Sequence, residues 1–261
     1  MTNLELCKQT VQQAQKAGAT DAVCRVYSSQ ELEITVDSGK SEGSEMSRDY
    51  SLSLTVYIGK KSASGYTEDM SPEAINELVD NLIAAAGMVP EDKYAGLPDP
   101  KHYQTQLDTW AKKLNMVDST GLPKPDDLLA MALDMEGAAR QVDKVYAVRD
   151  TSVSAAHSHM AIATSNGFAG EREGTMYGGS VSAVAEENDE KVIHYEGAAR
   201  RHFSDMPDVK TIGRKAGERA RDMLNQTELG TTGKLPLVFE DKLASHVLLG
   251  NLLRAMGGSL V

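Results

Sequence analysis

Cysteine is scarce in this chain of 261 residues, which has only two, Cys7 and Cys24. Two cysteines are too few for a disulfide framework, so we expect a protein of a reducing compartment. Both lie in segments with an apolar pattern, and we expect them to be small core residues with no reactive role.

The chain also lacks a long hydrophobic run and an excess of basic charge. Its longest apolar stretch, near Leu248–Leu253, is far shorter than the roughly 20 residues that span a bilayer. The first 18 residues contain no apolar core of a signal peptide, so we expect a cytoplasmic protein with no membrane contact. Lys and Arg number 27 against 38 Asp and Glu, a net charge of −11 that argues against nucleic-acid binding.

Periodicity predicts an α+β fold with antiparallel or mixed sheets and flanking helices. We expect helices that end near Gly18 and Gly87, the second with Ser71 as its N-cap, and two more over Asp126–Arg140 and Val209–Gln226. The expected strands are Ala22–Tyr27, Leu32–Val36, Leu52–Ile58, Ser62–Thr67, a strand from Val145 that continues through Val153–Thr164, Thr175–Glu186 and Lys191–Arg201. The order of strands and helix occurs twice, which suggests a duplicated strand-strand-helix unit.

Three short segments read as turns between these strands. Asn166-Gly167 is typical of a type I′ hairpin turn. Glu171–Gly174 also resembles a turn, and Glu186–Glu190 resembles a solvated hairpin loop. None of them places two carboxylates as an acid/base pair.

The positions of proline and glycine along the chain predict the domain organisation. An N-terminal α+β domain over residues 1–88 precedes a linker at 89–108, which holds three of the eight prolines. A central α+β domain follows at 109–234. Residues 235–261 begin with an expected strand, Leu235–Phe239, and continue into an apolar helix over Leu243–Met256. We interpret them as the start of a third domain that is cut off.

Familiar catalytic signatures are missing from the sequence. It has no HExxH, GxSxG, Walker or GxGxxG motif and no CxxC pair. The best metal candidates are His157 and His159, which would share one face of a strand. His194, with Glu196, could supply a further ligand from a neighbouring strand. Two exposed histidines on a solvated sheet face explain the same pattern without a metal.

Several motifs together resemble the TldD/PmbA family, also known as modulators of DNA gyrase. The most specific is the linker Val89–Pro98, with the sequence VPEDKYAGLP. The others occur in the order expected for the family and cover nearly the whole chain: Ala17–Ala19, Val56–Ser64, Thr67–Asp69, Thr164–Phe168 and Leu235–Phe239.

The resemblance also points to one branch of that family. The TldD-like branch has a zinc-binding HExxH on a helix that follows the linker, whereas the corresponding helix here, Asp126–Arg140, contains no histidine. The chain therefore resembles the PmbA (TldE-like) branch. Family members are longer, with a β-rich C-terminal domain that would begin near Leu235.

This resemblance implies a non-catalytic subunit of a cytoplasmic metalloprotease, with no catalytic residue and no cofactor of its own. Zinc is expected in a TldD-like partner, with which the chain would form a heterodimer that acts on unfolded peptides. An extended peptide could add as a strand to a sheet edge. Two alternatives remain open: a peptidase with zinc on His157, His159 and His194, and a non-proteolytic interaction module in a toxin or gyrase pathway.

Overall fold

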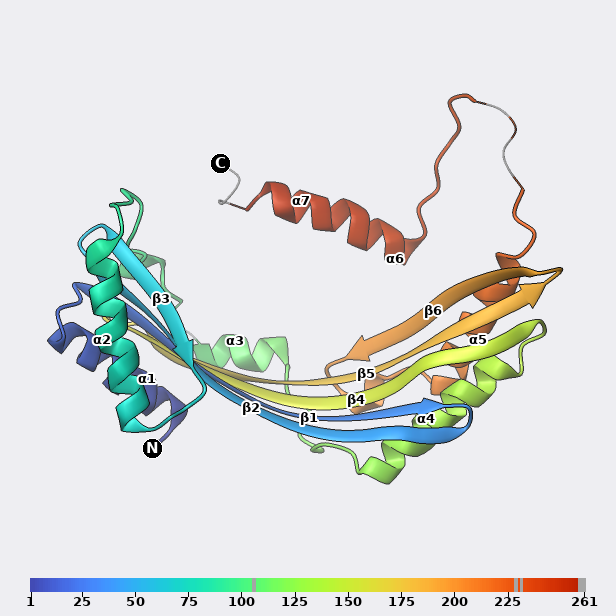
Figure 1. The fold of residues 1–261 in the computed structure, drawn as a ribbon, viewed down its shortest axis with the longest axis horizontal. Coiled ribbons are helices and arrows are strands. Elements are labelled where there is room, and N and C mark those ends of the chain that lie inside the picture. The colour runs from blue at the N-terminus through green and yellow to red at the C-terminus, as the bar shows by residue number, and fades with distance from the viewer. Residues whose placement is uncertain (105–106, 228–229, 231, 258–261) are drawn as a thin grey trace. The chain divides into compact units, whose positions relative to one another are not determined.

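A single six-stranded antiparallel sheet forms the centre of the protein (Figure 1). The computed structural model describes residues 1–104, 107–227, 230 and 232–257. The strand order is β3-β2-β1-β4-β5-β6. The bounds are β1 Asp21–Asp37, β2 Lys40–Ile58, β3 Lys61–Thr67, β4 Val145–Thr164, β5 Ala169–Glu187 and β6 Glu190–Arg200.

The helices repeat around this sheet, which supports the predicted duplication. The first repeat runs α1-β1-β2-β3-α2 and the second repeat runs α4-β4-β5-β6-α5, and β1 pairs with β4 where the two repeats meet. The helices are α1 Asn3–Lys16, α2 Pro72–Met88, α3 Leu107–Leu114, α4 Pro125–Arg140 and α5 Val209–Asp222, with short 3-10 turns η1 Pro100–His102 and η2 Phe203–Asp205. The α+β fold class is confirmed.

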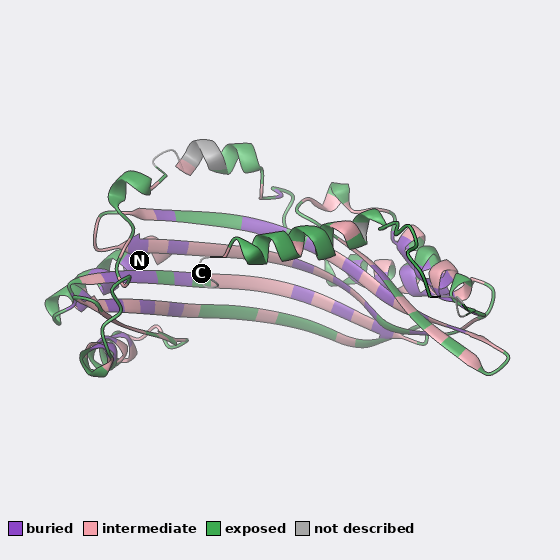
Figure 2. Ribbon diagram, turned by 90° about the horizontal axis from the view of Figure 1, so that it is seen from above, coloured by how far each residue is buried: buried purple, intermediate pink, exposed green. Residues whose placement is uncertain are grey.

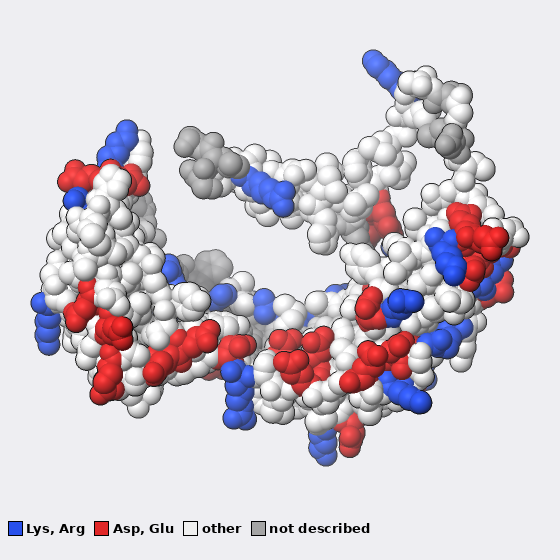
Figure 3. All heavy atoms as spheres, viewed as in Figure 1, with Lys and Arg blue, Asp and Glu red and all other residues white. Residues whose placement is uncertain are grey.

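Both hydrophobic cores lie on the same face of the sheet, at its two ends. One packs α1 and α2 against β1, β2 and β4, and the other packs α4 and α5 against β1, β4 and β5. In Figure 2 the buried residues accordingly gather towards the ends of the strands, with exposed and half-buried residues between them. We call this the helix-bearing face, and the opposite, hollowed side the open face (Figures 1 and 3).

Local sequence explains where the helices begin. The Thr2 side chain accepts a hydrogen bond from the Glu5 N–H, and the Glu5 carboxylate accepts one from the Thr2 N–H, which makes a capping box at α1. Ser71 caps α2 ahead of Pro72, as predicted. Cys7 and Cys24 are fully buried free cysteines between α1 and β1, so their predicted core position is confirmed.

The strands are longer than predicted. Ala22–Tyr27 and Leu32–Val36 belong to one continuous strand, because β1 stays paired with β2 from Asp21 to Asp37. The predicted turn at Glu171–Gly174 is wrong: these residues lie inside β5, in register with β4. A backbone ladder holds them extended although their composition resembles a turn.

Two further expectations about local backbone are wrong. Asn166-Gly167 joins β4 to β5 as predicted, but not in a type I′ turn, since Gly167 has a positive φ of 100° and Asn166 does not have a positive φ. Residues Leu235–Phe239 form no strand; they are irregular and exposed.

The chain divides into two compact units, Met1–Leu224 and Asn225–Val261. Strands from both predicted α+β domains, 1–88 and 109–234, therefore share one sheet in the first unit. The second unit contains the predicted apolar helix, as α6 Asp241–Ala244, a π-helical turn η3 Ser245–Leu249 and α7 Gly250–Ala255. None of the helices that the structure describes is long and apolar enough to cross a membrane.

Candidate functional site

The middle of the helix-bearing face carries polar side chains where neither helix pair covers the sheet. The strand register brings Ser28 of β1, His159 of β4 and Glu173 of β5 into one row, and Gln30 and His157 into the next. We call this region the polar strip: Ser28, Gln30, Arg48, Tyr50, His157, His159, Glu171 and Glu173.

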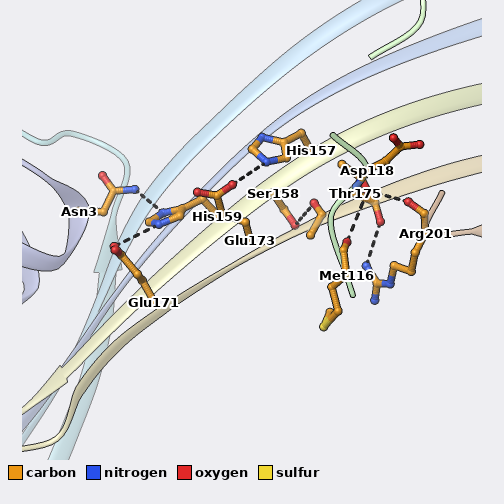
Figure 4. A network of polar contacts seen from close by, with 11 residues as sticks. Asn3, Met116, Asp118, His157, Ser158, His159, Glu171, Glu173, Thr175 and Arg201 are labelled. Carbon is orange, nitrogen blue, oxygen red and sulfur yellow. Dashed lines mark hydrogen bonds and ion pairs between the residues drawn. The ribbon is translucent and has the colours of Figure 1, made fainter. Parts of the chain in front are cut away.

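Each histidine of the polar strip faces its own glutamate (Figure 4). The Nε2 atom of His157 lies 3.2 Å from Oε2 of Glu173, and that of His159 lies 3.3 Å from Oε2 of Glu171. His157 is 41% exposed and His159 is 19% exposed at the side chain. Such solvent-accessible ion pairs contribute on the order of 0–1 kcal/mol.

The start of α1 extends this network from the side. Asn3 Nδ2 lies 3.0 Å from His159 Nδ1, and the Tyr50 hydroxyl donates to Asn3 Oδ1 at 2.7 Å. His159 is thus held between α1 and β5, which explains why it is less exposed than His157. The sequence pattern correctly placed the two histidines on one face.

His194 does not join these two histidines. It lies opposite Ala183 of β5, whereas His157 lies opposite Thr175, eight residues away along the same strand. At about 3.3 Å per residue this separation is roughly 26 Å. Glu196, which lies opposite Val181 and 3.6 Å from Arg219 Nη1, is remote in the same way. Within the described part of the chain, no group of three or more His, Cys, Asp or Glu side chains could hold a metal ion.

The open face carries a small pocket of about 190 Å³ beside β5. The residues that line it are Tyr27, Met116, Ser158, Met160, Arg172, Glu173, Gly174 and Arg201. The sequence does not reveal this pocket, because the composition of residues 171–174 predicts a turn. Strand alternation places the side chain of Arg172 on the face opposite the side chains of Glu171 and Glu173.

Asp118 is a buried carboxylate that accepts several hydrogen bonds. Thr120 donates to its Oδ1 from both the hydroxyl and the N–H, and the Phe203 N–H donates to its Oδ2 at 2.7 Å. These bonds, with a smaller contribution from the nearby His202, lower the pKa of Asp118 to about 2. Its own N–H donates to Thr175 Oγ1, so Asp118 joins the segment after α3 to β5 and, through Phe203, to the chain that follows β6.

Comparison with known proteins gives the family. The family model described as PmbA/TldA metallopeptidase domain 1 matches residues 22–86, and the one described as the PmbA/TldA metallopeptidase central domain matches residues 120–224. The chain belongs to the PmbA/TldD family. The resemblance seen in the sequence is confirmed.

Curated relatives agree with this assignment. Metalloprotease PmbA of Escherichia coli O157:H7 is 27% identical over 233 residues, which cover 88% of this chain and 50% of the relative. A Metalloprotease PmbA homolog of Haemophilus influenzae is 24% identical over 253 residues, 96% of this chain and 54% of the relative. The chain thus spans about half the length of the curated relatives it matches.

Solved structures share the fold. A protein described as a modulator of DNA gyrase from Bacteroides thetaiotaomicron superposes with a TM-score of 0.78 at 23% identity, over 86% of this chain and 51% of that one. TldE from Thermococcus kodakarensis gives 0.65 at 16% identity, over 83% and 47%. These names agree with the PmbA/TldE-like branch predicted from the sequence.

Proposed function

We propose that this chain is the non-catalytic, PmbA/TldE-like subunit of a cytoplasmic TldD/TldE-type zinc metallopeptidase that cleaves unfolded peptides. The observation that carries the proposal is the family membership of a chain whose helix α4 contains no histidine. Without an HExxH helix, the zinc and its activated water belong to a TldD-like partner.

Helix α4 packs the core and holds a turn, which is consistent with a non-catalytic subunit. Its sheet-facing side chains Leu128, Ala132, Met135 and Ala139 are fully buried in the core. The buried Glu136 accepts a hydrogen bond from the Gly39 N–H at 2.8 Å and pairs with Arg140. Glu136 therefore fastens the β1–β2 turn to α4.

The remaining metal candidates do not fit a zinc site in this chain. His157 and His159 each face a separate glutamate, and His194 lies far along the sheet. A zinc site needs three or four ligands that converge on one point. We therefore derive no catalytic step from these histidines.

The sheet offers backbone on which an extended peptide could add. β3 pairs only with residues 52–58 of β2, so the outer edge of residues 40–51 has no strand partner in the described sheet, and the outer edge of β6 has none either. An unpaired edge supplies main-chain donors and acceptors to an incoming strand whatever its sequence. This suits a subunit that positions unfolded peptides near a partner's zinc.

Reconstitution tests the proposal. The purified chain, a TldD-like partner and their mixture are assayed for cleavage of unfolded casein and for zinc by mass spectrometry. We expect no cleavage by the lone chain, zinc in the partner, and a stable complex with activity well above that of either component.

The control variant combines His157→Ala with His159→Ala, and we expect it to leave the activity of the mixture unchanged. Zinc-dependent cleavage by the lone chain that this double variant abolishes would show that the chain is a peptidase in its own right.

A further inference from the structure

The two faces of β5 carry opposite charges in its open middle. Glu171 and Glu173 point to the helix-bearing face, where they meet the histidines of the polar strip (Figure 4). Arg172 and Gly174 alternate with them and line the pocket on the open face. Basic side chains are visible along this hollowed side in Figure 3, although the chain as a whole is acidic.

Arg201 is positioned by two contacts with Thr175. It follows the last residue of β6, its main-chain oxygen accepts from the Thr175 hydroxyl at 2.6 Å, and its Nη1 donates to the Thr175 main-chain oxygen at 3.2 Å. The guanidinium is thereby held at the pocket, and its Nε and Nη2 groups remain as donors.

Among the described residues, no carboxylate forms an ion pair with Arg172 or with Arg201. Other cations of the first unit, such as Lys144, Arg140 and Lys210, do have acidic partners. What distinguishes Arg172 and Arg201 is that both line one pocket, where the two guanidinium groups are available to one anion.

The absence of a side chain at Gly174 keeps this pocket open. A Cβ built there would lie 3.3 Å from Arg201 Nη1 and 3.7 Å from the main-chain oxygen of Met116. It would crowd the guanidinium and fill the space between Arg201 and Met116. Tyr27, 42% exposed, also lines the pocket.

We propose that the Arg172–Arg201 pocket binds a carboxylate of an extended peptide. A guanidinium binds a carboxylate through two parallel hydrogen bonds, and this geometry suits arginine better than lysine. A volume of about 190 Å³ holds one side-chain-sized group and is small for a complete drug-sized ligand. This inference rests on the proposed function, since it names the peptide group that the subunit recognises.

Three acetylated pentapeptides distinguish the sources of the carboxylate. They are penta-alanine with a free C-terminus, the same peptide amidated, and an amidated peptide with one central glutamate. Binding to the full chain is measured by isothermal titration. We expect the amidated penta-alanine to bind at least about tenfold more weakly than one of the two acidic peptides, as loss of a charged hydrogen-bonded group implies.

Variants assign the binding to the pocket. Arg172 is exposed, so Arg172→Gln leaves the fold intact, and we expect it to weaken binding of the preferred acidic peptide about tenfold. Gly174→Ala should weaken it too, by displacing Arg201. The matched control is Arg214→Gln, an exposed arginine of α5 that should leave binding unchanged.

Two results would overturn the carboxylate site: equal binding of all three peptides, or undiminished binding to Arg172→Gln. Absence of any peptide binding would overturn it as well. Because reconstituted cleavage with a TldD-like partner is a separate assay, it shows independently whether the proposed function stands.

Discussion

Two glycines of α5 set how closely that helix approaches α4. A Cβ at Gly213 would lie 2.0 Å from the main-chain oxygen of Met135, and one at Gly217 would lie 2.8 Å from Val142 Cβ. The obstacle at Gly213 is backbone, which cannot move aside as a flexible side chain can. The second core therefore depends on the absence of a side chain at this position.

Gly213→Ala should destabilise the protein by about 1–3 kcal/mol or more, because α4 and α5 must separate to admit a methyl group. Urea denaturation followed by circular dichroism measures the change. Gly137→Ala in α4 is the matched control: nothing lies within 4 Å of its added Cβ, so it should raise stability by up to about 1 kcal/mol. Equal effects of the two variants would contradict close packing at Gly213.

Single residues differed in how far their positions could be predicted. Alternation along β4 placed His157 and His159 together, because strand period is a local property. Arg172 was missed, since the run Glu171–Gly174 has a turn-like composition. Its extended conformation comes from pairing with residues 158–161 of β4, and that register is not visible in a short window.

At the scale of elements, the segment between α3 and α4 is anchored through Asp118. The β5–β6 ladder stops at Tyr177, opposite Arg200, and the main-chain N–H of Thr175 donates to the Met116 oxygen at 2.9 Å. Asp118 then bonds to Thr175, Thr120 and the Phe203 N–H. These contacts join parts of the chain that are up to 85 residues apart.

Asp118→Asn should make the free energy of unfolding depend less on pH in the acid range. The folded-state pKa of about 2 lies below the usual value of about 3.9 for an unfolded aspartate, so the carboxylate stabilises the fold fully above pH ~4. This contribution is lost as the pH falls through about 2. The free energy of unfolding, measured with urea, should therefore decrease more steeply between pH 4 and 2 in the wild type than in the variant.

The control for Asp118 is Asp205→Asn, which changes an exposed aspartate of η2. We expect its acid dependence to follow the wild type. If the free energy of unfolding of Asp118→Asn fell with pH as steeply as that of the wild type, the hydrogen bonds of this carboxylate would not persist in solution.

Elements with a one-sided apolar pattern were predicted well, and the others were not. The helices α1, α2, α4 and α5 bury a stripe that the sequence displays. The middle of β1 was missed because Ser28, Ser29 and Gln30 are polar on both faces. Pairing with β2 on one side and β4 on the other keeps it extended. The expected strand Leu235–Phe239 lacks such a neighbour among the described residues.

At the scale of the whole molecule, one sheet supports two separate hydrophobic cores. All buried apolar residues of the two clusters lie between Leu6 and Leu224. In the second unit the large apolar side chains of the helix are exposed, among them Leu248, Leu252 and Leu253. The stability of the sheet should therefore come from the first unit alone.

A chain that ends at Leu224 should keep the midpoint and cooperativity of urea unfolding shown by the full chain, because it retains every residue of both cores. The matched control ends at Met206 and removes α5, with the buried Val209, Ile212, Ala216 and Ala220. This control should lose cooperative unfolding of the core beneath α4 and α5, since β5 and α4 then expose apolar surface to water. A lower midpoint for the chain ending at Leu224 would show that residues 225–261 stabilise the sheet.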